Sequence, residues 1–421
     1  MRGGPPPFGA KRANDWRNLH EIQPRPNNNV DEWHILDAFR PIAAKAAGDG
    51  GDGYTSATII MIVNGWECHP KGRRRFYGDG SMSRANPSNL TNQKPWTEMP
   101  LLSICIATYN RAGYLAETLD SIVPQLADDV ELLVVDGAST DNTEDVVQGY
   151  TKSDARIRYV RLSVKGGVDQ DYNRSVELAH GEFCWLFTDD DLLRPGAVTA
   201  VRTAIKKGHD LVVVNAEVRD RELAAILEAQ RIVIQHDRVY GPNETERLFV
   251  DALRYLSFIG SVVIRRSIWM NRQPRLFFGT EFVHVGVIFQ NPLPNSATVI
   301  AEPYITIRSG NAQWTARSFD IWMFKWPKMV WSFGHISDEA KRSVSSREPW
   351  RSFRTLIRQR SLGGYDLKSY RQYVVAMPAG AFWKCSAWLI ACLPMKIAVG
   401  IKDSYLAIKT LRRSIARVVR R

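Results

Sequence analysis

The feature that most constrains the fold is an alternation of two patterns between residues 101 and 215. Short apolar runs of strand length alternate with segments whose apolar residues recur at helical spacing. Each predicted strand is apolar at nearly every position, which is typical of a sheet covered by helices on both faces. Strands that alternate with helices in this way form mostly parallel sheets. The sequence therefore predicts an α/β domain built on a mostly parallel central sheet.

The predicted elements cover most of the chain after residue 98. Strands are expected at residues 101–107, 130–135, 157–162, 183–188 and 211–215, with helices at residues 115–126, 141–150, 171–179 and 195–207 between them. Residues 216–258 are expected to be mainly helical, followed by strands at residues 259–264 and 298–308. We expect a main domain over residues 99–318 and a helical C-terminal region, rich in Trp and Arg, over residues 319–421.

Residues 1–98 differ in composition from the rest of the chain. They contain nine Pro and eleven Gly, in tracts such as PPP and GDGGDG, and show little periodicity apart from an apolar run of strand length at residues 56–63. One interpretation is a disordered leader, because such a composition buries too little apolar surface to fold. The other is that the natural protein starts at Met99 and that the residues before it belong to a misassigned start.

Basic charge is concentrated at the C-terminus. The 421-residue chain has a formal net charge of +12, and residues 402–421 contribute +6 of it through seven basic residues and one acidic residue. A nucleic-acid-binding domain spreads its basic charge over one face instead, whereas a basic tail suits an anionic membrane surface. The charge pattern therefore favours a lipid partner over nucleic acid.

The cysteines and the apolar runs indicate the compartment. Five cysteines without a C-x-x-C pair argue against a disulfide framework and against a zinc site. Cys105 and Cys184 fall inside apolar runs and are expected to be buried and reduced. The sequence shows no signal-peptide core and no apolar stretch of about 18 residues, the length of a membrane span. We therefore expect the chain in a reducing cytoplasm.

Polar residues gather where three of the predicted strands end. The first strand is followed by Thr108, Tyr109, Asn110 and Arg111, the second by residues 136–143, and the fourth by Asp189, Asp190 and Asp191. Ligands of parallel α/β sheets bind beyond the carboxyl ends of the strands. Helix capping is the alternative for one such cluster, since Ser139 and Asp141 are good capping types. Three clusters at one predicted edge favour a binding site.

Three consecutive carboxylates after a buried strand repel one another unless a positive charge lies among them. Oxygen ligands of this kind suit Mg²⁺ or Mn²⁺. A metal ion at Asp189, Asp190 and Asp191 would hold a diphosphate and stabilise it as a leaving group. The alternative is a solvated acidic turn that caps the following helix. The position of the cluster after the predicted strands favours the metal site.

Three motifs in order carry a resemblance to a known family. The segments SICIATYNRAGYLAETLDSI (103–122), VVDGASTDNT (134–143) and DQDYNRSVELAHGEFCWLFTDDDLL (169–193) resemble the family 2 glycosyltransferases of the GT-A fold. The segments FIGSVVIRRSIW (258–269) and YITIRSGNAQW (304–314) resemble, more loosely, the branch with bacterial abequosyltransferases and other O-antigen sugar transferases. The resemblance implies a Rossmann-like sheet that binds a nucleotide-sugar and transfers its sugar.

The resemblance also implies roles for the polar residues. The implied donor-binding residues are Thr108, Tyr109, Asn110, Arg111, Asp136, Ser139, Asp169, Asn173, Arg174, Asp189 and Arg308. Within this set, Thr108, Tyr109 and Asn110 would line the base and ribose pocket, and Asp136 would lie near the base. Asp169, Asn173 and Arg174 would approach the nucleotide or the diphosphate. Asp189 and Asp190 would lie near the ribose and the donor sugar, with Asp191 and Asp189 as metal ligands. The D-x-D motif of the family is D-D-D here, so the ligand assignment within it stays open.

Inverting transfer needs a base that removes a proton from the acceptor hydroxyl. The family usually supplies a carboxylate in an E-D pair, which this chain lacks. We expect Glu281 to be the base, with His284 as an alternative base or a sugar ligand. The structural alternatives are a solvated loop for Glu281 and a packed or capping histidine. Arg308 and Trp314 would close over the diphosphate and the acceptor sugar, although Arg308 suits a structural role at a strand end equally well.

The segment 379–421 combines apolar anchors with Lys and Arg. This combination suits a helix lying in a membrane interface, and each basic residue near an anionic leaflet adds about 1 kcal/mol of attraction. A helix packed on the catalytic domain is the alternative, and no nucleic-acid motif accompanies the charge. Membrane attachment would suit a lipid-linked acceptor, which the resemblance implies. We therefore expect a peripheral protein at the inner face of the cell membrane.

The combined prediction is an inverting, metal-dependent glycosyltransferase. It would move a sugar from a nucleotide-sugar donor to a hydroxyl of a lipid-linked glycan in surface-polysaccharide or O-antigen synthesis. A nucleotidyltransferase on a similar sheet and a non-catalytic nucleotide-sugar-binding or scaffold protein are the rival interpretations. The sequence contains no P-loop, no H-E-x-x-H motif and no G-x-G-x-x-G at Gly166 and Gly167. It names neither the donor base, the sugar, the linkage nor the oligomeric state.

Overall fold

The computed structural model describes the backbone of residues 98–311 and 317–419, with side chains described up to residue 405 and at residues 407 and 408. The composition-biased segment before residue 98, with its apolar run at residues 56–63, lies outside the described residues, as does Trp314. The domain boundaries at residues 98 and 318 stay predictions.

The domain is built on a ten-stranded mixed sheet with the order β3-β2-β1-β4-β9-β6-β10-β5, with β7 beside β6 and β8 beside β10. The strands are β1 (Leu102–Thr108), β2 (Val130–Asp136), β3 (Ile157–Arg161), β4 (Phe183–Phe187), β5 (Leu192–Leu193), β6 (Leu211–Arg219), β7 (Ile226–Glu228), β8 (Arg238–Tyr240), β9 (Val262–Arg265) and β10 (Ala297–Arg308). Strands β3, β2, β1 and β4 pair in parallel, as do β6 and β10. Strand β9 is antiparallel to both of its neighbours.

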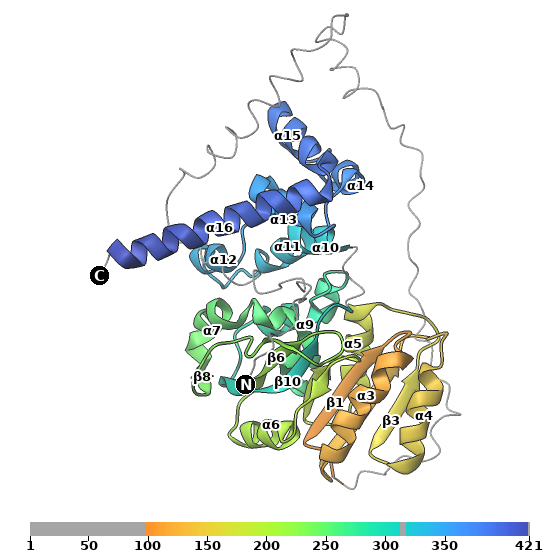
Figure 1. Cartoon of the computed structure of the whole chain (residues 1–421). Coiled ribbons are helices and arrows are strands. Elements are labelled where there is room, and N and C mark those ends of the chain that lie inside the picture. Colours follow the sequence, from red (N-terminus) through yellow and green to blue (C-terminus); the bar gives the residue numbers. More distant parts are fainter. Residues whose placement is uncertain (1–97, 312–316, 420–421) are drawn as a thin grey trace, which may run out of the picture. The chain divides into compact units, whose positions relative to one another are not determined.

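Helices connect and cover these strands. They are α3 (Ala112–Ile122), α4 (Thr143–Ser153), α5 (Val168–Leu178), α6 (Ala197–Lys206), α7 (Thr245–Ala252), α8 (Arg266–Met270) and α9 (Val283–Phe289). Figure 1 shows α3 and α4 in front of the strands β1 and β3. The mostly parallel sheet with flanking helices confirms the predicted α/β fold class, including the five strands expected up to residue 215.

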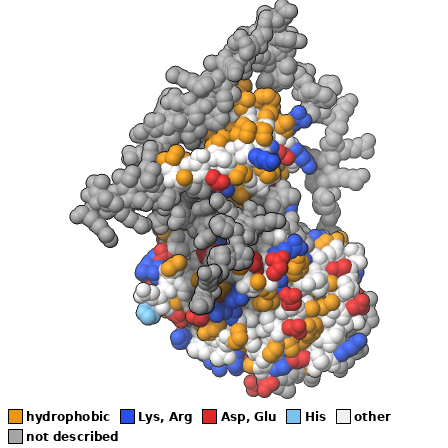
Figure 2. Space-filling model, in the orientation of Figure 1, with side chains coloured by type: hydrophobic (Ala, Val, Ile, Leu, Met, Phe, Trp, Pro, Cys, Tyr) orange, Lys and Arg blue, Asp and Glu red, His pale blue; other side chains and the backbone are white. Residues whose placement is uncertain are grey.

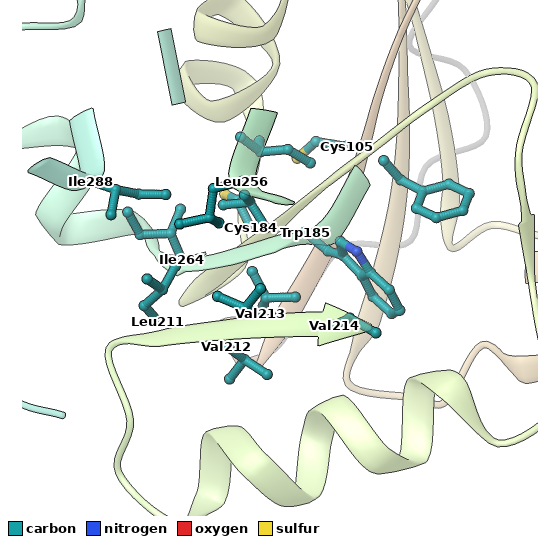
Figure 3. Close-up of a cluster of buried hydrophobic side chains, with 14 of the residues drawn as sticks. Cys105, Cys184, Trp185, Leu211, Val212, Val213, Val214, Leu256, Ile264 and Ile288 are labelled. Carbon is teal, nitrogen blue, oxygen red and sulfur yellow. The ribbon is translucent and has the colours of Figure 1, made fainter. Parts of the chain in front are cut away.

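The core lies in the middle of the sheet, where strands are buried on both faces. Figure 3 shows how β1, β4, β6 and β9 bring Cys105, Cys184, Trp185, Leu211, Val212, Val213, Val214 and Ile264 together with Leu256 and Ile288. The indole N–H of Trp185 donates to the carbonyl oxygen of Gly260 at 2.8 Å, so burying this side chain leaves no polar group unpaired. Cys105 and Cys184 are buried free thiols, as predicted.

The register brings the functional loops to one edge. Thr108 at the end of β1 pairs with Asp136 at the end of β2, and Ile106 pairs with Phe187 at the end of β4. Because these strands are parallel, their carboxyl ends and the loops that follow them share one side of the sheet. The predicted gathering of the polar clusters at this edge is confirmed.

The prediction that residues 216–258 are mainly helical is wrong. Strand β6 continues to Arg219, β7 and β8 follow, and α7 is the regular helix of this segment. Residues 216–219 pair with residues 305–308 of β10. If residues 216–219 formed a helix, the backbone groups of residues 305–308 would lose these partners. The strand expected at residues 259–264 begins with a 3₁₀ turn, Ile259–Ser261, before β9.

The C-terminal region is helical, as predicted. It contains α10 (Ser318–Asp320), a π-helical turn η9 (Ile321–Lys325), α11 (Trp326–Val330), α12 (Asp338–Val344), α13 (Phe353–Ser361), α14 (Leu367–Ser369), a second π-helical turn (Tyr370–Val374), α15 (Ala381–Cys392) and α16 (Met395–Val419). Trp326, Met329 and Phe333 belong to the same hydrophobic core as the sheet. Pro394 lies between α15 and α16, where its missing N–H and fixed φ interrupt the helix.

Candidate active site

The loops after β1 and β2 are tied together by several hydrogen bonds, including two made by Asn110. Asn110 has a φ of 53°, a left-handed conformation that Asn tolerates better than most residues. Its backbone N–H donates to Ser139 Oγ at 2.9 Å, and its side-chain Oδ1 accepts from the N–H of Thr140 at 2.7 Å. Ser139 is buried. The two loops therefore form one rigid rim at the edge of the sheet.

Asp136 supports this rim through hydrogen bonds from the end of β2. Its carboxylate is buried and accepts from the N–H of Ser139 at 2.8 Å and from the hydroxyl of Tyr159 at 2.6 Å. Burial and this hydrogen bond raise the pKa of Tyr159. Arg161 Nη1 lies 3.7 Å from Oδ2 of Asp136, the same oxygen that accepts from Tyr159. The predicted role of Asp136 near a nucleotide base stays a prediction.

A third loop lies beside the rim and was missed by the sequence analysis. Asp171, near the start of α5, accepts from the N–H groups of Gly166 and Gly167 at 3.1 and 3.2 Å, and burial raises its pKa to about 6. In the same loop, Lys165 places its ammonium 3.4 Å from the centroid of the Tyr109 ring. The Gly-Gly pair before a helix was a signal for this loop, although it lacks dinucleotide spacing.

Asp189 and Asp190 share one counter-ion. The Arg111 guanidinium lies 3.4 Å from Asp189 Oδ1 and also bonds Asp190. Asn311 Nδ2 donates to Asp190 Oδ2 at 2.8 Å. Burial, followed by the charges of Asp191 and Asp189, raises the pKa of Asp190 to about 8, and burial also raises the pKa of Asp189. Burial therefore disfavours the ionised forms of these carboxyl groups in spite of their contacts with Arg111.

Asp191 points into the protein. One of its carboxylate oxygens accepts from the Thr188 hydroxyl at 2.5 Å and the other from the N–H of Arg308 at 2.8 Å. Its carbonyl oxygen accepts from the Thr118 hydroxyl at 2.9 Å. Burial raises the pKa of Asp191 to about 6. Both carboxylate oxygens thus have protein donors, unlike the more outward position of Asp190.

Arg308 anchors several segments at once. Its Nε donates to the carbonyl oxygen of Asp190 at 3.1 Å, and Nη1 donates to that of Arg221 at 2.8 Å. Its Nη2 bonds the carboxylate of Glu117, and the guanidinium lies 5.3 Å from the Tyr114 ring centroid. These contacts agree with the structural alternative for Arg308, and its predicted contact with a diphosphate stays a prediction.

Glu281 occupies a strained loop that Asp169 holds in place. Glu281 has a φ of 72°, in the left-handed region. The carboxylate of Asp169 accepts from the N–H groups of Glu281 and Val283, each at 2.9 Å. The Glu281 carboxylate in turn accepts from Arg317 at 2.7 Å and from Lys325 at 3.3 Å. The structure therefore places Asp169 at the loop of the predicted base, and its contact with a nucleotide stays a prediction.

A comparison with known families decides the class of this site. Residues 103–272 match the sequence model of the family described as Glycosyl transferase family 2. These residues form a family 2 glycosyltransferase domain. The rim, the acidic cluster and Asp169 all lie inside the matched range, whereas Glu281 and Arg308 follow it. The family predicted from the sequence is therefore confirmed.

Relatives of the family 2 domain include two bacterial proteins that are named as glycosyltransferases. The chain is 29% identical over 206 residues to the abequosyltransferase RfbV of Salmonella typhimurium, covering 46% of this chain and 62% of that protein. It is 36% identical over 112 residues to a GalNAc(5)-diNAcBac-PP-undecaprenol β-1,3-glucosyltransferase of Campylobacter jejuni, covering 26% of this chain and 36% of that protein. The chain thus spans about three fifths of the first relative and about one third of the second.

Solved structures that align with this chain include a protein in complex with UDP and a mannosyltransferase. TarS residues 1–349 of S. aureus in complex with UDP aligns with a TM-score of 0.48 at 16% identity, over 65% of this chain and 78% of that chain. The mannosyltransferase PcManGT of Pyrobaculum calidifontis, in complex with GDP-Man and Mn²⁺, aligns with a TM-score of 0.42 at 17% identity, over 73% and 88%.

His284 is buried within the domain. It lies on α9, and its Nε2 is 2.7 Å from the carbonyl oxygen of Leu256, to which it donates. Burial lowers the pKa of His284 to about 4, so the ring is neutral near pH 7. Its Nδ1 is buried and has no hydrogen-bond partner among the described residues. This environment agrees with the packed-histidine alternative, and the predicted catalytic role stays a prediction.

Asn173 and Arg174 lie together on α5. Asn173 accepts from the indole N–H of Trp269 at 3.0 Å and donates to Glu177 at 2.8 Å. Arg174 forms an ion pair of 3.0 Å with the same Glu177 and is about two-fifths exposed. The structure therefore brings neither side chain into the hydrogen-bond network of the acidic cluster, and their predicted contacts with the donor stay predictions.

The acidic cluster fits a divalent cation in its chemistry. Within residues 98–311 and 317–419, no group of three or more His, Cys, Asp and Glu side chains is arranged to hold a metal ion. Mg²⁺ sites, however, commonly use one or two carboxylates together with substrate phosphates. Asp189 and Asp190 supply two carboxyl groups in a buried cluster, where burial disfavours their ionised forms and a cation would favour them. The donor set present therefore suits a site that the substrate completes.

Proposed function

We propose that this chain transfers a sugar, with inversion, from a nucleotide-sugar donor to a hydroxyl of a lipid-linked glycan in surface-polysaccharide or O-antigen synthesis. One observation carries the proposal. In a family 2 domain, the preformed rim and the buried acidic cluster converge at the carboxyl ends of β1, β2 and β4. This edge is where α/β sheets bind their ligands.

The rim would bind the nucleoside. Asn110 and Ser139 fix its backbone, so the ribose hydroxyls and the polar edge of the base would meet groups that are already in position. Tyr109 offers an aromatic face beside the rim, and Lys165 covers that face in this structure. A base that stacks on Tyr109 would displace Lys165 toward the diphosphate, where its charge is favourable.

Asp189 and Asp190 would hold Mg²⁺ or Mn²⁺ together with the diphosphate of the donor. The ion would neutralise the charge that develops on the departing nucleoside diphosphate. Arg111, which bonds both carboxylates, would keep them oriented. Asp191 would position the cluster rather than bind the metal directly, because both of its carboxylate oxygens already accept from protein groups.

Glu281 would accept the proton of the acceptor hydroxyl. As the hydroxyl oxygen bonds to the anomeric carbon, the bond from that carbon to the diphosphate breaks, and the nucleoside diphosphate leaves. Arg317 and Lys325 form ion pairs with the Glu281 side chain, and Asp169 holds its backbone. The incoming acceptor would take the place of one of the two cations at the Glu281 oxygens.

The C-terminal helices would bring the domain to a membrane. Exposed apolar side chains recur on α15 and α16: Phe382, Trp388, Leu389, Met395, Ile397 and Ile408. Figure 2 shows hydrophobic side chains gathered on the visible face over α15. Lys384, Lys396 and Lys402 belong to the same two helices. Apolar anchors beside cations are typical of helices that lie in an interface.

Membrane-spanning helices are not found in the described part of the chain. No single helix there is long and apolar enough to cross a bilayer. Helix α15 and the first part of α16 reach that length and apolarity together, but they meet at a bend of 108°. We therefore propose attachment to one leaflet. Co-sedimentation with anionic and neutral vesicles tests this proposal. The fraction of protein that pellets with anionic vesicles should fall with Trp388→Ser. An equal fraction of protein in the pellet with and without vesicles would contradict the proposal.

Turnover of donors tests the transferase proposal. Release of nucleoside diphosphate is measured for UDP-, GDP-, CDP- and dTDP-sugars, with and without Mn²⁺ and with a lipid extract as acceptor. We expect release from donors of one base, dependent on Mn²⁺ and accelerated by the extract. A folded chain that binds a donor without releasing its diphosphate would favour a non-catalytic sugar-nucleotide-binding protein instead.

A further inference from the structure

A groove in the C-terminal region lies outside the site described above. One wall is formed by the continuous helix made of η9 and α11, and the other by residues 346–350. The groove has a volume of about 730 Å³, within the range of small-molecule sites. Phe324, Lys328, Trp331, Arg347 and Trp350 line it. Its walls therefore combine aromatic faces with cations.

The helical wall touches the loop of the predicted base on its other face. Phe324, Lys328 and Trp331 are spaced by four and three residues, so they share the groove face. On the opposite face, Lys325 bonds Glu281 at 3.3 Å, and Trp326 packs against Phe282 with ring centroids 4.7 Å apart. One helix therefore separates the groove from Glu281.

The second wall touches the helices proposed to meet the membrane. The ring of Trp350 lies 5.1 Å from that of Trp383 on α15, in an edge-to-face arrangement. The indole N–H of Trp383 donates to the carbonyl oxygen of Arg351 at 3.0 Å. The groove thus has the Glu281 loop behind one wall and α15 behind the other.

The cations of the groove exceed its anions. Among the described residues, neither Lys328 nor Arg347 has a carboxylate within 4 Å, and Glu348 is paired with Arg351 at 2.6 Å. The Arg347 guanidinium lies 5.3 Å from the centroid of the Trp331 ring. The next hollow along Trp331 and Arg347 is lined by Arg342, a further cation. Two uncompensated cations beside aromatic rings fit an anion that carries an apolar body.

We propose that this groove binds the diphosphate linkage of a lipid-linked acceptor. The inference rests on the proposed function. Lys328 and Arg347 would bind phosphate oxygens, while Phe324, Trp331 and Trp350 would contact the first isoprenoid units or sugar faces. The lipid would continue toward α15, and the glycan would pass around the helix toward Glu281. The groove would thereby select acceptors by their phosphate-bearing end, away from the reacting hydroxyl.

Binding of farnesyl diphosphate to the full chain tests this proposal by isothermal titration. Farnesol and inorganic pyrophosphate are the matched probes, since each carries half of the ligand. We expect farnesyl diphosphate to bind at least about tenfold more tightly than either half. Pyrophosphate that binds as tightly would indicate a site for free phosphate and overturn the lipid-linked assignment. Farnesol that binds as tightly would indicate an apolar surface and overturn it too.

Variants locate the binding. Arg347→Gln and Lys328→Gln should each weaken farnesyl diphosphate binding about tenfold, the loss of about 1.4 kcal/mol expected for one charged contact. Lys206→Gln, which removes the same charge from an exposed position on α6, should leave the affinity unchanged. Circular dichroism melting confirms that each variant is folded.

The donor site also prefers diphosphates, so a variant must separate the two sites. Binding that survives Asp190→Ala and falls with Arg347→Gln assigns the diphosphate to the groove. The reverse pattern places it at the donor site and overturns the proposal. Donor turnover by the unmodified chain, measured on the same preparation, tests the proposed function separately. A failed groove therefore leaves the transferase proposal standing.

Discussion

The rim and the acidic cluster lie at the same sheet edge but differ in how well their polar groups are satisfied. In the rim, Asn110, Asp136 and Ser139 are joined by short hydrogen bonds among themselves and their neighbours. In the acidic cluster, burial raises the pKa values of Asp189, Asp190 and Asp191, and the charges of neighbouring carboxylates raise those of Asp190 and Asp191 further. The polar groups of the rim have their hydrogen-bond partners within the protein. In the cluster, ionisation of the carboxyl groups is unfavourable, and a bound cation would make it favourable. We expect changes in the rim to affect stability and changes in the cluster to affect activity.

The largest expected effect is the loss of transfer in Asp190→Asn. Removing one of two metal-binding carboxylates should lower kcat at least about a thousandfold, since metal stabilisation contributes several kcal/mol. The same change removes a carboxyl whose ionised form burial disfavours, so the Tm of the metal-free chain should stay equal near pH 6.5 and rise near pH 8. Metal-dependent turnover and thermal melting are measured on the same sample. Loss of activity together with a large drop in Tm would show that Asp190 is needed for stability, contrary to the expected difference between the rim and the cluster.

The next effect concerns the predicted base. Glu281→Gln should lower kcat by about a hundredfold to ten-thousandfold, the usual contribution of a positioned base, while donor binding is retained. Asp169→Asn should lower kcat less, because Asn still accepts one of the two backbone hydrogen bonds. The pH dependence of kcat separates a positioning role from proton transfer. If Asp169 only positions the Glu281 loop, Asp169→Asn should keep the pH dependence of the unmodified enzyme. Equal activity of Glu281→Gln would remove Glu281 from its role.

The pH dependence of stability should show the cluster directly. The pKa of Asp190 is raised to about 8 in the folded chain, so the folded state binds more protons than the unfolded state below that pH. Stability from this group is therefore full at acid pH and is lost as the pH rises toward 8. His284, with its pKa lowered to about 4, has the opposite effect, but only below about pH 6.5.

The window from pH 6.5 to 8 lies above the pKa of about 6 of Asp171 and Asp191, so the titration of Asp190 and of its neighbour Asp189, whose pKa burial also raises, dominates there. In this window the Tm of the metal-free chain should fall with rising pH, and Asp190→Asn should flatten the fall. Mn²⁺ should also flatten it, because the metal binds the ionised carboxylate. A Tm that rises across this window would contradict the raised pKa. Melting curves in matched buffers, with and without Mn²⁺, are the measurement.

The smallest expected effects lie in the rim. Asn110→Ala puts Ala, which tolerates the left-handed conformation less well than Asn, at a φ of 53°. It also removes the hydrogen bond from the N–H of Thr140, and the two losses together should cost about 1–2 kcal/mol. Asn110→Gly removes the same side chain without the backbone strain, so it serves as the matched control. The difference between the two Tm values measures the strain. Equal Tm values would show that the left-handed conformation contributes nothing.

Much of the sheet could be predicted because its signals are local. Each of the strands β1, β2, β3, β4 and β6 is a short apolar run, and the polar residues that follow it reach the same edge by the rule of parallel strands. The segment 216–240 could not be predicted in the same way. Residues 216–219 pair with β10, 89 residues later, while β7 pairs with β6 and β8 pairs with β10, whereas local spacing suggested a helix.

The roles of individual side chains were less predictable than their location. Asp169 bonds a loop 112 residues away, and Arg308 reaches Asp190 and Asp191 across more than 115 residues. Such contacts carry no sequence signal of their own. Asp171 and Lys165 were missed because nothing in the spacing indicates that the Gly166–Gly167 turn lies beside Tyr109.

The most direct test of the central claim is a titration of nucleoside diphosphates against the full chain, with and without Mn²⁺. A thermal shift reports the binding, since a ligand at 100 times its Kd adds about 2.7 kcal/mol of stability. We predict that one nucleoside diphosphate raises the Tm in the presence of Mn²⁺, and that Asp190→Asn abolishes the Mn²⁺-dependent part. An equal shift without metal, or an unchanged shift in Asp190→Asn, would contradict a metal-dependent donor site at this sheet edge.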